Sequence, residues 1–294
     1  MELWVALALG SAFLQNLRSA LQKALTGRLT LLGATYARFV FAAPWAVLAA
    51  LALTVGAGRP VPGVTPAFLV TALTGGLGQI AGTLLLLRLF TLRNFAVGNT
   101  FAKTETVQAA MMGALLLGDR VGALPLAGIL VSLVGIVLLS AGGWRRGGDG
   151  TVLLGLACGA AFAWSAVAYR AAALGLAGEA GFVARAAFTL AVVTVAQTVA
   201  LGLWMGLRAP GEIGAVLRAW RAAAPVGLAG MLASFGWFTA FTLASAAQVK
   251  AVGQVELIFS WLTARHAFGE RPSRRETIGI GLVAGGIVLL VLTS

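Results

Sequence analysis

Cysteine and histidine are almost absent from this chain of 294 residues, which has one of each, Cys158 and His266. One cysteine excludes an intramolecular disulfide, and one histidine excludes the ordinary histidine-rich metal sites. The single histidine stands beside Arg265, and no serine, histidine and acid arrangement for nucleophilic catalysis can be drawn around it. We therefore expect a protein that is not an enzyme and that holds no metal or other cofactor.

Charge is equally scarce. Only 10% of the residues are charged, whereas 60% are hydrophobic and the mean hydropathy is +0.95. Soluble domains carry about 25% charged residues, so the composition predicts a helical protein that crosses a membrane many times. The net charge of +12 would suggest a nucleic-acid partner in a soluble protein. Here it indicates loop residues that meet anionic headgroups, so we expect the lipid bilayer as a partner and no nucleic acid.

Apolar runs recur along the whole chain at about 20 residues each, which is the length that crosses a hydrocarbon core. The connections between them are short and rich in glycine, proline and arginine, and no stretch is left for a soluble domain. We expect ten transmembrane helices, at residues 3–22, 31–56, 65–88, 95–117, 121–142, 151–172, 181–206, 222–243, 246–267 and 275–293.

The two halves of the chain repeat each other. A polar stretch from Gly98 to Arg120 returns from Val249 to Arg271, and Glu256 follows Glu105 by 151 residues. Five spans in each half is an odd number, so the second half must enter the membrane upside down. The predicted fold is an all-α integral membrane protein of ten transmembrane helices in two inverted five-helix repeats, residues 1–147 and 148–294. Inverted repeats commonly place a substrate site near the midplane of the membrane, at their interface.

Each copy of the polar stretch carries charges into an apolar surround. A charged side chain at membrane depth costs at least ~2.5–3.5 kcal/mol, so such groups normally face a bundle interior or a cavity. In one interpretation the lysines offer a positive field to a substrate carboxylate, and the glutamates receive an ammonium group or a proton. In the other, the glutamates pair with Lys103, Arg38 or Arg185 and hold the helices together. The candidate residues of this pair of helices are Asn99, Lys103, Glu105, Lys250, Gln254 and Glu256.

Other polar and aromatic residues in the spans predict a cavity lining. Arg38 and Arg185 lie near span ends, where an arginine can also extend to the headgroups or pair structurally. Arg18, near the end of the first span, is interpreted as an orientation residue. The predicted lining comprises Gln15, Asn16, Gln79, Thr83, Trp164, Ser165, Trp237, Arg38 and Arg185.

The chain resembles a known family in these features. Ten spans in two halves, Arg38 early in the second span, and Glu256 upstream of Gly269-Glu270-Arg271 are similar to the drug/metabolite transporter superfamily, EamA type. Within that family the chain looks most like the YddG-like amino-acid exporters. The resemblance implies an alternating-access exporter of small metabolites, with aromatic or other neutral amino acids as substrates. It also implies an inner-membrane protein with both termini in the cytoplasm.

Several alternatives stay open. Anionic metabolites, such as organic acids, phosphate esters or nucleotide-sugars, would also suit the intramembrane positive charge, and a membrane sensor or scaffold would bind a ligand without moving it. Proton coupling and facilitated diffusion fit the sequence equally, and a monomer is compatible with it. Rich use of alanine, glycine and arginine indicates a bacterial source. Lysine and arginine are concentrated in the odd connections, which favours both termini outside the cytoplasm, against the resemblance.

Overall fold

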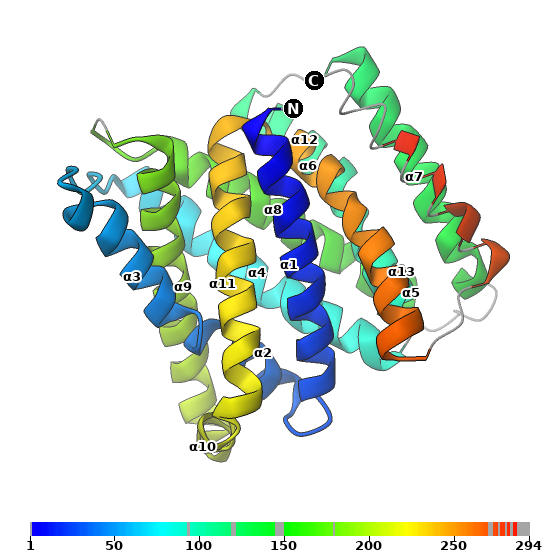
Figure 1. Ribbon diagram of the computed structural model, residues 1–294, viewed down its shortest axis with the longest axis horizontal. Coiled ribbons are helices and arrows are strands. Elements are labelled where there is room, and N and C mark those ends of the chain that lie inside the picture. The colour runs from blue at the N-terminus through cyan, green and yellow to red at the C-terminus, as the bar shows by residue number, and fades with distance from the viewer. Residues whose placement is uncertain are drawn as a thin grey trace.

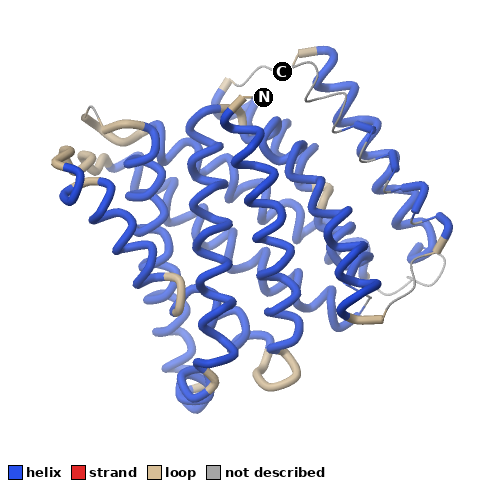
Figure 2. Tube along the Cα trace, viewed as in Figure 1, coloured by secondary structure: helices blue, strands red, loops and turns tan. Residues whose placement is uncertain are grey.

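The chain is described by a computed structural model that covers residues 2–92, 95–118, 122–144, 150–178 and 180–269, with short pieces between 273 and 286. Within these residues all regular elements are helices, and one isolated antiparallel bridge joins Gly63 to Ala177. The helices pack side by side as a bundle (Figures 1 and 2). The predicted repeat boundary at residues 147 and 148 lies outside the described residues, as does most of the predicted span 275–293.

The first half contains α1 (Leu3–Leu25), α2 (Leu31–Val40), α3 (Ala43–Leu53), the 3₁₀ turn η1 (Val55–Ala57), α4 (Pro66–Leu92), α5 (Phe95–Ala102), α6 (Glu105–Leu117) and α7 (Ala123–Trp144). The second half contains α8 (Thr151–Leu174), α9 (Phe182–Arg208), α10 (Pro210–Arg218), α11 (Trp220–Leu243), α12 (Ala246–Val252), the 3₁₀ turn η2 (Gly253–Val255) and α13 (Glu256–Ala267). These helices cover the predicted spans from residue 3 to residue 267 with ends that differ by a few residues.

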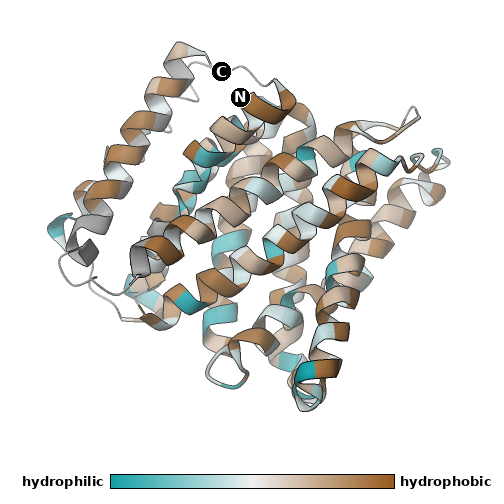
Figure 3. Cartoon of the chain, turned by 180° about the vertical axis from the view of Figure 1, so that it is seen from behind, coloured by the Kyte–Doolittle hydropathy of each residue, from teal (hydrophilic) through white to brown (hydrophobic). Residues whose placement is uncertain are grey.

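The described residues contain helical stretches that are long and apolar enough to cross a membrane. There are five of them, Leu31–Ala57, Pro66–Leu92, Leu153–Leu174, Phe182–Arg208 and Trp220–Leu243. Large apolar side chains point away from the bundle, and those of Leu115 and Leu207 are more than 80% exposed. Hydrophobic residues recur along most helices of the bundle (Figure 3). The prediction of a helical membrane protein is confirmed.

The structure corrects the sequence analysis where continuous helices were expected. The predicted span 31–56 is interrupted between α2 and α3. Pro44 stands in the first turn of α3, where its missing N–H costs no helical hydrogen bond. The spans 95–117 and 246–267 are also interrupted, at Lys103-Thr104 and at η2. A further short helix, α10, stands where a loop was expected.

Two helix pairs enclose the centre of the bundle. The helix α1 packs along α11, and α4 packs along α8. The α4–α8 contact is close because α4 presents glycines to it: a Cβ atom on Gly75, Gly78 or Gly82 would lie 2.9 Å from a side-chain atom of α8. Small residues let helices approach in this way inside membranes. The helix α7 contacts α5 and α6 and lies at the edge of the bundle (Figure 1).

Candidate functional site

The two polar stretches each form an interrupted helix, α5–α6 in the first half and α12–η2–α13 in the second, and the two pack against each other. The helix α5 packs against α13, and α6 packs against α12. Glu105 is the first residue of α6, and Glu256 is the first residue of α13. The N-terminus of a helix has unpaired N–H groups and a partial positive charge, which stabilises a carboxylate there. The interruptions therefore give each buried glutamate a favourable position.

The two glutamates form a network of ion pairs with two lysines. The Nζ atom of Lys103 lies 2.5 Å from Oε2 of Glu256 and 3.6 Å from Oε1 of Glu105. The Nζ atom of Lys250 lies 3.2 Å from Oε2 of Glu105. All four residues are buried. Two positive charges thus neutralise two negative charges across the helix breaks. This arrangement agrees with the interpretation in which the glutamates hold helices together. Lys103 is a partner named there, Lys250 is an additional one, and Arg38 and Arg185 form none of the ion pairs of this network.

Gln15 extends this network to the aromatic wall of the bundle. Its Nε2 donates to Oε2 of Glu256 at 2.8 Å, and its Oε1 accepts from Nε1 of Trp237 at 2.9 Å. The ammonium of Lys250 lies 5.0 Å from the centre of the Trp237 ring, within cation–π range. One glutamine side chain on α1 therefore links the charged network to α11.

Several other predicted site residues join helices to one another. Asn99 donates to the hydroxyl of Ser260 at 2.7 Å, and that hydroxyl donates to Oδ1 of Asn16 at 3.0 Å. The amide of Asn16 then donates to Thr263 at 2.7 Å. Gln254 donates to Thr106 at 2.8 Å, and its Oε1 is buried without a partner. Asn99, Asn16 and Gln254 do not line the cavity described next.

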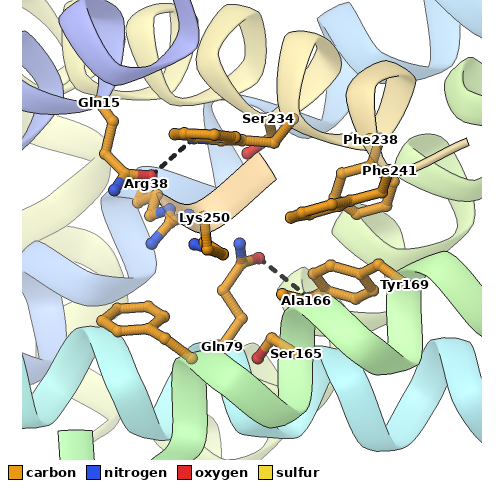
Figure 4. Close-up of a pocket in the computed structure, with 12 residues that line it drawn as sticks. Gln15, Arg38, Gln79, Ser165, Ala166, Tyr169, Ser234, Phe238, Phe241 and Lys250 are labelled. Atoms are coloured by element: carbon orange, nitrogen blue, oxygen red, sulfur yellow. Dashed lines mark hydrogen bonds between the residues drawn. The ribbon is translucent and has the colours of Figure 1, made fainter. Parts of the chain in front are cut away.

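A small cavity lies between α1, α2, α4, α8, α11 and α12 (Figure 4). Its volume is about 20 Å³, slightly more than the ~10–15 Å³ that one water molecule needs. Aromatic rings form much of its wall, while Arg38, Gln79 and Lys250 point toward its centre (Figure 4). The lining consists of Gln15, Arg38, Gln79, Phe162, Ser165, Ala166, Tyr169, Ser234, Trp237, Phe238, Phe241 and Lys250.

Arg38 is the cation of this lining that lacks an acidic partner. One of its N–H groups donates to Oγ1 of Thr83 at 2.6 Å, and the Thr83 hydroxyl donates to the backbone carbonyl of Gln79 at 2.7 Å. Arg38 is 4% exposed. No carboxylate in the described part of the chain forms an ion pair with it. The cavity therefore has a buried guanidinium that, among the described residues, no carboxylate approaches within ion-pair distance.

Arg18 lies next to Arg38 and is also a buried arginine. The Arg18 guanidinium donates to the side chains of Ser19 and Gln22, and its Nε is buried without a partner. The two arginines meet at Gly230, where a Cβ atom would lie 3.1 Å from Cδ of Arg18 and 3.5 Å from Cγ of Arg38. Among the residues that the structure describes, Arg18 also has no carboxylate partner.

A cluster of hydrogen bonds supports the opposite side of the cavity. Gln197 on α9 donates to Oε1 of Gln79 at 2.9 Å and to the carbonyl of Gly76 at 3.0 Å. The Tyr169 hydroxyl also donates to Oε1 of Gln79, at 3.2 Å. These bonds fix the amide of Gln79 between α4, α8 and α9, so its orientation at the cavity is determined by three helices.

The structure places the predicted residues in different roles. Arg185 donates to the loop carbonyls of Gly178 and Ala180, and Trp164 lies beside Gly78, so neither lines the cavity. Thr83 supports Arg38 from behind the lining. The predicted residues that do line the cavity are Gln15, Arg38, Gln79, Ser165, Trp237 and Lys250.

Sequence analysis missed residues whose signal was visible. Arg18, interpreted as an orientation residue, is 2% exposed inside the bundle. Ser19 and Gln22 follow it on the same helix, and Gln22 shares its face at i+4, which indicates a buried polar face. Gln197 is the single amide of α9 and marks the polar side of that helix. Phe162 and Tyr169 gave no signal that distinguishes them from ordinary packing residues.

Comparison with known proteins shows a shared fold but no family. Neither a protein-family model nor a curated protein sequence matches the chain. Among solved structures 27 chains match it. One of them, described only as "Crystal structure of protein", has a TM-score of 0.72 over 99% of this chain and 97% of its own length, at 20% identity. At that identity the likeness shows a shared backbone arrangement along the whole chain, and it carries no statement of activity.

Proposed function

We propose that this protein is an alternating-access transporter that exports small metabolites, with aromatic or other neutral amino acids as the leading substrates. Its ten transmembrane helices would form two inverted five-helix repeats, in the manner of the EamA type of the drug/metabolite transporter superfamily. A bacterial inner membrane would be its location. The observation that carries the proposal is the meeting of two interrupted helices, each with a buried glutamate at its restart, beside a central cavity.

Interrupted helices inside a membrane are typical of transport sites. A break exposes backbone groups and helix termini that can interact with substrates or ions, and it is tolerated only where it lines a cavity or is buried in protein. Buried ionisable residues are retained inside membranes mainly for function. The network of Lys103, Glu105, Lys250 and Glu256 satisfies both descriptions. It gives the two halves a set of contacts that can form and separate as a site opens.

The size of the cavity supports a moving mechanism. At about 20 Å³ it has room for roughly one water molecule and far less than an amino acid occupies. Helices around it must therefore separate before a substrate enters. Rocking of one group of helices against another around a central site is the usual form of alternating access.

Counterflow in proteoliposomes tests the proposal. Vesicles are loaded with one unlabelled amino acid, and the entry of the same labelled amino acid is followed, in parallel with protein-free vesicles. We expect accumulation of aromatic or other neutral amino acids. Repeating the measurement with an imposed pH gradient tests proton coupling, because an unchanged initial rate removes it. If folded, reconstituted protein moves none of the tested amino acids or organic anions, transport is the wrong function and a ligand sensor takes its place.

A second substrate class is favoured by a specific observation. Among the described residues the cavity lining contains Arg38 and Lys250 and no glutamate or aspartate, and Lys250 is already paired with Glu105. An anionic metabolite would find in Arg38 a positive charge that has no ion-pair partner among these residues. Competition in the same counterflow assay between organic acids and amino acids of matched size distinguishes the two classes.

A further inference from the structure

We infer that Arg38, with Arg18 behind it, binds the oxyanion group of the transported substrate, a carboxylate or a phosphate. This inference rests on the proposed function for the word "transported", although the binding site itself can be tested separately. It differs from the expectation drawn from sequence, in which the lysines received the carboxylate.

The two buried lysines already have carboxylate partners. Lys103 lies between Glu256 and Glu105, and Lys250 pairs with Glu105. A substrate carboxylate approaching either lysine would compete with a carboxylate that is already in place. Arg18 and Arg38 have no such competitor in the described chain, so an anion gains most beside them.

A buried charge without an opposite charge beside it destabilises a protein. Taking an ion out of water costs several kcal/mol, and proteins normally recover this cost through an opposite charge and a full set of hydrogen bonds. A guanidinium carries five N–H donors. Arg38 uses one on Thr83, and Arg18 has a buried Nε without an acceptor. Two adjacent like charges that are incompletely bonded fit a site that is completed by an anion.

The geometry of the Arg38 guanidinium suits an oxyanion ligand. The Thr83 hydroxyl fixes one side of the Arg38 guanidinium, and the guanidinium points into the cavity (Figure 4). Gly230 provides the space in which both arginine side chains approach each other, since any larger residue would press on them. The planar fork of an arginine matches two oxygens of a carboxylate or phosphate. Arg38 is therefore the direct ligand, and Arg18 adds positive charge from behind.

The aromatic wall of the cavity suits the apolar part of the substrate. Phe162, Tyr169, Trp237, Phe238 and Phe241 surround the cavity. Rings of this kind pack against an aromatic or branched apolar group. The substrate class is thus a small molecule with one oxyanion group attached to an aromatic or apolar body. The oxyanion is the required group, and an amino group alone does not replace it.

A binding experiment with purified protein tests this site. The probes are 3-phenylpropionate, phenylalanine, phenyl phosphate and phenethylamine, and the readout is the shift of the thermal unfolding midpoint in detergent. We expect the compounds with an oxyanion to raise the midpoint and phenethylamine to leave it unchanged. The probe with the larger shift identifies the oxyanion as carboxylate or phosphate. Equal shifts with phenethylamine and 3-phenylpropionate would overturn the inference, and this comparison needs no variant.

Variants then assign the site to Arg38. We expect Arg38→Gln to weaken binding of the effective probe by about 10- to 100-fold, which is the scale of a charge-assisted hydrogen bond, and Arg38→Lys to restore part of it. Arg185→Gln is the matched control, because that arginine bonds loop carbonyls instead. Unchanged binding in a folded Arg38→Gln protein would refute the site. Oxyanion binding without counterflow would refute transport alone, whereas counterflow that ignores Arg38 would refute the site alone.

Discussion

The ammonium of Lys103 lies 2.5 Å from a carboxylate oxygen of Glu256, a residue 153 positions later in the chain. The first residue stands at the break between α5 and α6, and the second begins α13 after the 3₁₀ turn η2. One ion pair therefore joins two interrupted helices at the point where each is weakest in backbone hydrogen bonds.

Removing one partner of this pair should destabilise the protein strongly. Lys103→Met removes the ammonium nearest to the buried Glu256 carboxylate, which keeps the amide of Gln15 as a donor, and a buried charge that loses its partner costs about 3–5 kcal/mol. Glu256→Gln should be milder because it removes charge while keeping an acceptor. Unfolding in detergent, followed by helical circular dichroism, gives the free energies. The double variant Lys103→Met with Glu256→Met should recover most of the loss, and additive losses would show that the pair contributes little.

Removing the Arg38 charge should leave the unfolding midpoint unchanged or raise it, in contrast to the loss expected for Lys103→Met. Arg38→Met keeps an apolar stem of similar length and takes away a buried charge that has no ion-pair partner among the described residues, so we expect an unfolding midpoint equal to or higher than that of the wild type. The same variant should lose the midpoint shift caused by an oxyanion probe. Stability gained together with binding lost is the pattern of a residue kept for function. A fall of the midpoint comparable to that of Lys103→Met would show that Arg38 is structural.

The break between α2 and α3 should depend on Gly227. A Cβ atom at that position would lie 2.5 Å from the backbone carbon of Phe41. Backbone cannot move aside as a flexible side chain does, so Gly227→Ala should cost roughly 1–3 kcal/mol, the usual range for overpacking. Gly10→Ala is the matched control, because it lies in α1 with nothing within 4 Å of its Cβ position. Alanine favours a helix over glycine, so Gly10→Ala should leave stability unchanged or slightly higher. Equal effects of the two variants would contradict the close contact.

The helices could be predicted from sequence because long apolar runs leave a chain in a membrane few alternatives. Hydropathy predicts a helix at 95–117 but not its interruption at Lys103-Thr104. Four buried charges from two distant segments meet at this break, and no local pattern contains that meeting. Pro44 was the local signal for the break in the second span, and Ser245 with Gln248, which form a capping box, mark the start of α12.

The sequence predicted which residues line the candidate site better than how these residues pair with one another. Scarcity of polar residues drew attention to Gln15, Gln79 and Lys250, and these do line the cavity. A pair between Lys103 and a glutamate was among the expected interactions, whereas the Lys250–Glu105 pair was not, since helix faces predict neighbours on one helix and not partners across helices. Arg18 and Arg185 show the limit clearly. Both stand near a span end, yet one is buried beside Arg38 and the other bonds a loop.

The last prediction concerns which helices stay together when the cavity opens. Cys158, the single cysteine of the chain, lies on α8 with no exposed surface, and its Sγ is 3.4 Å from the carbonyl of Gly82 on α4. The α4–α8 contact has no spare room, because Gly82 sits directly against the ring of Phe162. Tightly packed helices of this kind tend to move as a rigid unit.

We therefore expect α4 and α8 to remain in contact during the proposed transport cycle, with the opening made between other helices. A membrane-permeant maleimide should label Cys158 very slowly in folded protein, and saturating substrate should not change the rate. Unfolding in dodecyl sulfate should make the thiol fully reactive, which serves as the control for reagent access. Because the chain has one cysteine, the labelled fraction read by mass spectrometry reports this contact alone. Labelling that accelerates severalfold with substrate would show that α4 and α8 separate, and the moving boundary would then run through the cavity between Gln79 and Tyr169.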